Sequence, residues 1–169
     1  MRIRQTTNEN VYVSEEQVID RSGWVCGIRR DPSKVSEGIP DNVYEAARDA
    51  TGRSAMLNPE GFMCCLGHVC HNAGFGKDLL LGKDFPENVI AGQDVFLDIP
   101  DLTRVGDYGS VRDSDFADKA AKINDDSDLS PKERERDLTV VFKEYGMKLK
   151  FVGRYPAAVR AYHKERFGE

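Results

Sequence analysis

The chain is organised around one stretch, Gly61-Phe62-Met63-Cys64-Cys65-Leu66-Gly67-His68-Val69-Cys70-His71-Asn72-Ala73-Gly74, which holds three of its four cysteines and two of its three histidines. Apolar side chains recur there at offsets of three and four residues, the spacing of one face of a helix. Gly74 predicts the helix end, because glycine readily adopts the left-handed conformation of that position. Gly67 lowers helix propensity by about 1 kcal/mol, so it indicates that another segment packs closely against the helix.

A metal site on this helix is one hypothesis. Cys64, His68 and His71 are spaced to share one stripe of the helix, and a thiolate with two imidazoles could ligate zinc. Structural zinc sites usually draw their ligands from two separated pairs, and the chain offers no second Cys or His pair. We therefore expect no metal and no other cofactor, and these three residues are the ligands if a metal is bound.

A cysteine nucleophile is a second hypothesis, because the start of a helix favours the thiolate and a separate His, Asn or Asp could complete the site. The alternative is that the cysteines are small core hydrophobes and the histidines are partly exposed. Cys65 shares the apolar face and should be buried. Cys64 is about 100° further round the helix and should lie nearer the surface or beside a turn at Asn124. We favour the core interpretation.

The length of 169 residues fits a single domain that needs no disulfides. Residues 1–20 are expected to form an irregular arm with at most one edge strand, and residues 75–114 a loop-rich segment punctuated by glycine and proline. The four cysteines and the absence of a signal-like N-terminus indicate a reducing compartment. No stretch reaches the length of a membrane span. We therefore expect a cytoplasmic protein that does not contact membranes.

The other elements predict a mixed α+β fold. Strands are expected around Trp24 and over residues 147–152, and one short segment of the loop region is a candidate third strand. Ser130, Pro131 and Glu133 make a strong helix start, a capping box with proline in the first helical position. Helical periodicity or end signals mark residues 39–51, 115–123, 131–145 and 156–162. The expected class is α+β, with about four helices packed on a small, mostly antiparallel sheet and a long irregular loop region.

The turn between two of these helices has the spacing of a calcium-binding loop. The five candidate ligands are Asn124, Asp126, Asp128, Ser130 and Glu135. Leu129 stands where such a loop requires glycine, and the capping box begins a helix inside the loop. We therefore expect a helix–helix turn without calcium.

Charge is unevenly distributed, although the net charge is only −5. Residues 94–128 contain ten aspartates and four basic residues, whereas residues 143–166 contain seven basic and two acidic residues. Aromatic residues interleave with the basic ones in the second segment, a composition typical of single-stranded nucleic-acid or nucleotide binding. The alternative is that the aromatics are core and the cations solvated. The candidate binding residues are Lys148, Lys150, Arg154 and Arg160.

Two fragments together resemble a known family. The run from Met63 to Cys70 resembles the Cys-Cys-Leu-Gly-x-x-Cys helix of small uncharacterised proteins encoded by tailed phages and prophages. In those proteins the helix is followed by a Leu-Pro-like turn, a variable loop and an (Ile/Leu)-Asn-Asp segment. Phe85-Pro86-Glu87-Asn88-Val89 and Ile123-Asn124-Asp125 stand at the matching places. The resemblance covers residues 60–145, so about sixty N-terminal residues and the basic C-terminal extension depart from it.

The resemblance implies an accessory protein that acts in the host cytoplasm. Our leading expectation is non-enzymatic binding of a host macromolecule, such as a protein, or of a small ligand, as in the inhibition of host defence. The first alternative is a cysteine-dependent hydrolase or transferase, with Cys64, Cys65, Asn124 and Asp125 as its catalytic residues. The second is nucleic-acid binding through the C-terminal segment. The sequence does not indicate an oligomeric state.

Overall fold

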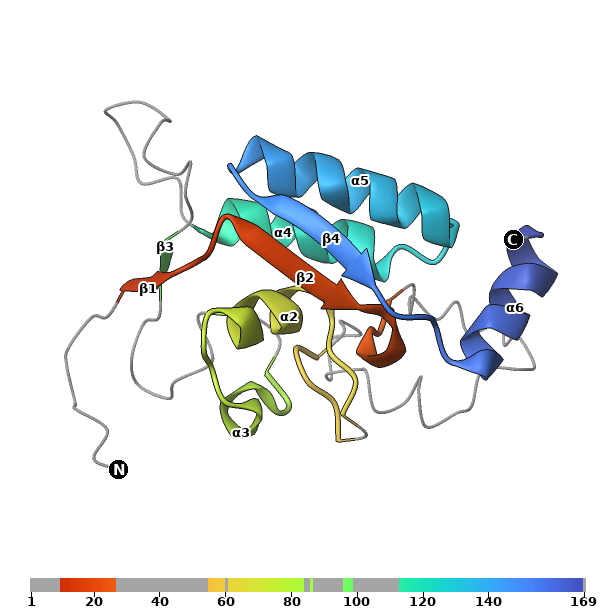
Figure 1. Cartoon of the computed structure of the whole chain (residues 1–169), viewed down its shortest axis with the longest axis horizontal. Helices are drawn as coiled ribbons and strands as arrows, with labels where there is room; N and C mark the ends of the chain where they lie inside the picture. Colours follow the sequence, from red (N-terminus) through yellow and green to blue (C-terminus); the bar gives the residue numbers. More distant parts are fainter. Residues whose placement is uncertain are drawn as a thin grey trace.

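The computed structural model describes residues 10–26, 55–59, 61–83, 86, 96–98 and 113–168 (Figure 1). The elements in chain order are β1 (Asn10–Tyr12), β2 (Glu16–Asp20), the 3-10 helix η1 (Arg21–Gly23), α2 (Cys65–Asn72), α3 (Lys77–Leu80), β3 (Phe96–Asp98), α4 (Asp113–Asp125), α5 (Pro131–Glu144), β4 (Lys148–Val152) and α6 (Ala157–Phe167). The predicted helix over residues 39–51 and most of the predicted loop-rich segment lie outside the described residues. Within them, no helix is long and apolar enough to cross a membrane.

The strands pair in parallel, so the predicted antiparallel sheet is wrong. β2 pairs with β4, with Glu16 opposite Lys148, and β1 pairs with β3. Parallel partners require a connection that crosses from one end of the pair to the other, and α2, α4 and α5 all lie within it. The predicted strand at Trp24 is also wrong, because Trp24 forms only an isolated bridge with Met63. The partner of β4 instead comes from the segment predicted to be an irregular arm.

The alternation of buried and exposed side chains in β2 explains why this strand was not predicted from the sequence. Gln17 and Ile19 point inward, while Glu16, Val18 and Asp20 are exposed. One of the two inward side chains is therefore a glutamine, which breaks the apolar pattern expected of a half-buried strand. Its amide is satisfied locally, since Nε2 donates to the carbonyl of Ser14 at 2.7 Å. A hydrogen-bonded amide can occupy such a buried position at little cost.

The helices lie behind the β2–β4 pair and enclose the core. Figure 1 shows the two strands in front, with α4 and α5 on one side and α2 on the other. Phe116 of α4 packs edge-on against Phe142 and Tyr145. The predicted start of α5 is confirmed, because the Ser130 side chain accepts from the Glu133 N–H and the Glu133 carboxylate accepts from the Ser130 N–H.

The close approach predicted at Gly67 is also confirmed. A Cβ on Gly67 would overlap the main-chain carbonyl oxygen of Met56 and would lie 3.1 Å from Met63 Cβ. Gly74 follows the end of the helix with φ of 100°, as predicted. Only glycine adopts that conformation without strain.

Candidate functional site

Asn124 joins three segments at the start of the cysteine helix. It lies in the last turn of α4 and is only 1% exposed. Its Oδ1 accepts hydrogen bonds from the main-chain N–H of Cys65 at 3.1 Å and from Nε1 of Trp24 at 2.8 Å. Its Nδ2 donates to the carbonyl of Val25 at 3.1 Å. Because the N-cap residue Cys64 makes no side-chain cap bond, Asn124 supplies from another helix an acceptor that α2 needs. We call this arrangement the Asn124 junction.

The four candidate catalytic residues do meet at this junction, where Cys64, Cys65 and Asn124 are buried and Asp125 is half-buried. Cys64 is 3% exposed and Cys65 is fully buried, with its Sγ 3.6 Å from the carbonyl of Ala120. Asn124 uses its amide in the junction, and Asp125 accepts from its Nδ2 at 2.9 Å. The prediction that Cys65 is buried is confirmed. Cys64 was expected to lie nearer the surface or beside the turn at Asn124, and the second alternative is the correct one, because Asn124 binds the next residue, Cys65. Cys64 is not nearer the surface, because the helix begins one residue later and Cys64 is extended rather than helical.

The thiols are poorly suited to nucleophilic chemistry. Burial raises the pKa of the Cys64 thiol to about 12, although the amides of Gly67 and Leu66 lower it. Burial also raises the pKa of Cys65 well above its ordinary value. Both thiols are therefore protonated at pH 7. Burial thus outweighs the helix N-terminus, and the geometry does not support a cysteine-dependent hydrolase or transferase.

Thiol labelling of the folded chain is expected to spare Cys64, Cys65 and Cys70. Each is buried, so a reagent reaches it only after the helix opens, which should slow the reaction roughly a thousandfold or more. Mass spectrometry after iodoacetamide treatment at neutral pH would measure this. The same treatment in guanidinium should label all four cysteines. Rapid labelling of Cys65 in the folded state would contradict its structural role and restore the nucleophile hypothesis.

The predicted metal ligands are not brought to one point. His68 is 5% exposed, which corrects the expectation that it is partly exposed. Burial lowers the pKa of His68 to about 4, so its ring is neutral at pH 7. His71 faces solvent, with Nδ1 3.1 Å from the carbonyl of Phe75, and Cys64 precedes the helix that carries both rings. No group of three Cys, His, Asp or Glu side chains in the described part of the chain could hold a metal ion.

The residues with calcium-loop spacing have separate structural roles. Asn124 belongs to its junction, Ser130 caps α5, and Glu135 binds Arg21. The turn is closed instead by the buried Arg134 of α5, which donates to the carbonyls of Asp126 and Leu129. The geometry is therefore that of a helix–helix turn.

A second polar cluster lies where β2 and β4 end side by side. Arg21 donates through Nε and Nη2 to the two carboxylate oxygens of Glu135, both at 2.7 Å. The Tyr155 hydroxyl donates to the same carboxylate at 3.0 Å. The hydrogen bonds that Arg21 donates to Glu135 raise the pKa of Arg21, and burial raises the pKa of Tyr155. The carboxyl end of parallel strands is a common ligand position in α/β proteins, but here the two charges satisfy each other.

Sequence reasoning missed this cluster. Arg21 and Glu135 are 114 positions apart. Arg21 lies just after the predicted arm, and the sequence indicated Glu135 only as a candidate calcium ligand. No local pattern pairs two such residues, since their contact depends on the parallel pairing of β2 with β4. The cluster anchors the segment after β4 to α5.

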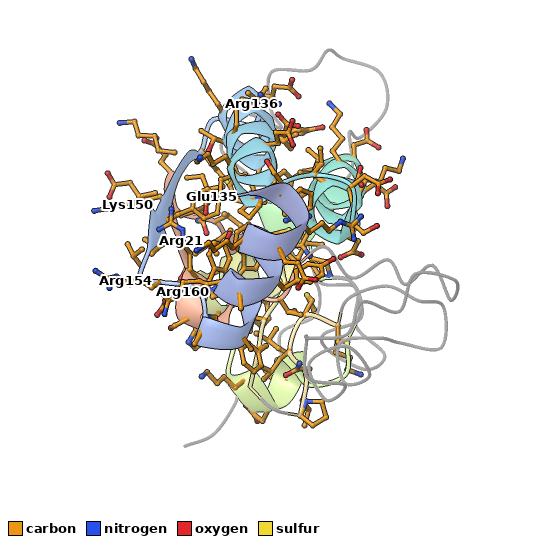
Figure 2. The ribbon with its side chains drawn as sticks, turned by 90° about the vertical axis from the view of Figure 1, so that its right-hand side faces the viewer. Arg21, Glu135, Arg136, Lys150, Arg154 and Arg160 are labelled. Carbon is orange, nitrogen blue, oxygen red and sulfur yellow. The ribbon has the colours of Figure 1, made fainter. Side chains whose placement is uncertain are left out.

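The predicted binding residues are exposed on β4 and on the segment that follows it. Lys148 and Lys150 point outward from β4, Arg154 follows the strand, and Arg160 lies on α6. Figure 2 shows Lys150 and Arg154 projecting on one side of the molecule, with Arg160 nearby. None of these four residues, hereafter the basic surface, forms an ion pair with another described residue, whereas Arg21, Lys119, Arg136 and Arg166 all do.

The aromatic residues of the same segment are already packed. Phe151 and Tyr155 lie against Trp24, with ring centroids 5.2 and 5.9 Å away. Tyr162 and Phe167 contact Arg166, at 6.0 and 5.3 Å from its guanidinium carbon. Nucleic-acid binding by stacking requires free aromatic faces, so this packing weakens the nucleic-acid interpretation while leaving the exposed charge intact.

No family model, curated protein or solved structure matches the chain. The resemblance to phage-encoded proteins therefore stays a prediction that depends on short motifs. The structure does bring these motifs together, because Asn124 of the Ile-Asn-Asp fragment binds the first helical residue of the Cys-Cys-Leu-Gly fragment.

Proposed function

We propose that this chain is a phage- or prophage-encoded accessory protein that binds an acidic host protein through its basic surface and performs no chemistry of its own. The observation that carries the proposal is the group of exposed side chains Lys148, Lys150, Arg154 and Arg160, which lack ion-pair partners among the described residues. Glu16, which lies opposite Lys148, is also exposed on this face, but the basic residues outnumber it. An excess of charge of one sign attracts an oppositely charged partner and raises its rate of association. The buried thiols and the packed aromatics argue against the two alternatives, a cysteine enzyme and a nucleic-acid-binding protein.

Reversing charge on the basic surface is expected to abolish capture of this partner. The double substitution Lys150→Glu with Arg154→Glu should weaken binding about tenfold or more, because like charges would then face each other. The matched control is Lys77→Glu with Lys122→Glu, which makes the same change of net charge on α3 and α4. Both variants and the parent chain would be immobilised and exposed to bacterial lysate, and the captured proteins identified by mass spectrometry.

The supporting result is a defined acidic protein retained by the parent chain and the control but not by the charge-reversed variant. Its retention should fall as salt is raised well above about 0.15 M, where exposed charges are increasingly screened. Capture that disappears when the lysate is treated with nuclease would replace the proposal with nucleic-acid binding. Equal capture by the charge-reversed variant would overturn it.

A further inference from the structure

One edge of β4 is not hydrogen-bonded within the described part of the chain. The main-chain N–H of Lys148 donates to the carbonyl of Glu15 at 2.6 Å, which fixes the phase of the parallel ladder. Alternate residues of a strand direct their main-chain groups to opposite sides. The main-chain N–H and C=O groups of Lys148 and Lys150 therefore face β2. The main-chain N–H and C=O groups of Leu149 and Phe151 face away from it. No described residue forms a hydrogen bond with these outward groups.

At the opposite edge of the pair, a side chain caps one outward main-chain carbonyl. Asn72, the last residue of α2, donates through Nδ2 to the carbonyl of Val18 at 3.0 Å and to Oε1 of Gln17 at 3.2 Å. Among the described residues no side chain covers β4 in this way, since α5 lies in the layer behind it and the strand lies at the margin of the ribbon (Figure 2). An open edge of this kind is a template for another strand.

The charged side chains of β4 determine which kind of strand can pair with its free edge. Lys148 and Lys150 are the outward side chains of β4, and Arg154 follows them. A second copy of β4 would place lysines against lysines, and like charges opposite one another destabilise strand pairs. An acidic strand would instead place carboxylates beside the same lysines. Because outward side chains recur at every second position, the fitting segment carries Asp or Glu in alternation with other residues.

We propose that the free edge of β4 binds an extended acidic segment of a partner protein by strand addition. The inference rests on the proposed function and specifies its binding mode. Main-chain hydrogen bonds from Leu149 and Phe151 hold the segment in register, and Lys148 and Lys150 select its acidic side chains. Strand addition to an exposed edge draws affinity from the main chain and specificity from alternate side chains in this way.

The test uses the probe peptide Glu-Val-Glu-Val-Glu-Val-Glu and two derivatives of the same charge. One derivative is N-methylated at every valine and the other at every glutamate after the first, so each lacks the amide donors of one side of the strand. One derivative should bind the full chain about tenfold or more weakly than the other, because only one side of the peptide hydrogen-bonds to β4. Fluorescence anisotropy of labelled peptides would measure the difference.

Amide hydrogen exchange of the protein provides the second measurement. In the free chain the Leu149 and Phe151 amides should exchange quickly while the Lys150 amide is protected, and the unmodified peptide should slow the first two about tenfold or more. If the peptide binds but both derivatives bind equally and these amides stay unprotected, strand addition is overturned and charge-based binding survives. If the peptide does not bind and Lys150→Glu with Arg154→Glu leaves lysate capture unchanged, both proposals fail. Binding of an oligothymidylate probe in preference to the peptide would also overturn strand addition.

Discussion

Replacing Asn124 with alanine is expected to lower the free energy of unfolding by roughly 3–5 kcal/mol. The side chain is 1% exposed, so water cannot readily take its place. Its removal leaves the Cys65 N–H, the Trp24 Nε1–H and the Val25 carbonyl without their partner. Each unsatisfied buried group costs about 1–3 kcal/mol. The three losses fall in one place, so they should not be simply additive.

Urea unfolding followed by circular dichroism would measure this loss, and Asn72→Ala is the matched control. Asn72 also links a helix to the neighbouring backbone through Nδ2, but it is solvent-exposed. Water can replace its hydrogen bonds, so the control should cost about 1 kcal/mol or less. The fluorescence of Trp24, the single tryptophan of the chain, should report the lost hydrogen bond directly. Equal losses in the two variants would show that the Asn124 junction does not stabilise the fold.

The junction also explains which parts of the candidate site could be read from the sequence. The motifs named Cys64, Cys65, Asn124 and Asp125 as one candidate site, and the structure places these residues at one junction. The motifs could not show whether such a junction is catalytic or structural, because the difference depends on burial. Burial raises the pKa of both thiols, and it follows from packing of segments that are distant in sequence.

Local signals predicted the elements they control. The capping box at Ser130, the end of α2 at Gly74 and the alternation that leads into β4 all involve residues a few positions apart, and all three are confirmed. The parallel pairing was not predictable in the same way, since it joins residues 16–20 to residues 148–152. Gln17 further concealed β2 by placing an amide where an apolar side chain was expected. The Arg21–Glu135 pair depends on this pairing and was missed with it.

The basic surface shows the same division between local and non-local information. Exposure of Lys148 and Lys150 followed from their alternation with Leu149 and Phe151. The role of the aromatics did not, because Trp24 lies more than a hundred positions before Phe151 and Tyr155, and packs against both. An interleaved pattern of charge and aromatics is therefore consistent with a nucleic-acid surface or with a charged face over a core. Only the three-dimensional contacts favour the second.

Replacing Gly67 with alanine is expected to destabilise the chain by roughly 2–4 kcal/mol, even though alanine improves helix propensity by about 1 kcal/mol. The added methyl group would overlap the main-chain carbonyl oxygen of Met56. That carbonyl cannot rotate away as a side chain could. The same residue is held from the other side, since the Met56 N–H donates to the carbonyl of Lys83 at 2.6 Å. Relief of the overlap therefore requires movement of α2 or of the Met56 segment.

Gly23→Ala is the matched control, because a Cβ at Gly23 meets no atom within 4 Å. It should change the free energy of unfolding by about 0.5 kcal/mol or less. A comparison of the two variants by urea unfolding separates the steric effect from the general effect of replacing glycine. If Gly67→Ala proved as stable as the parent chain, α2 and the Met56 segment would not be in close contact. A stable variant would also remove the physical reason for glycine within the Cys-Cys-Leu-Gly motif, which we attribute to this contact.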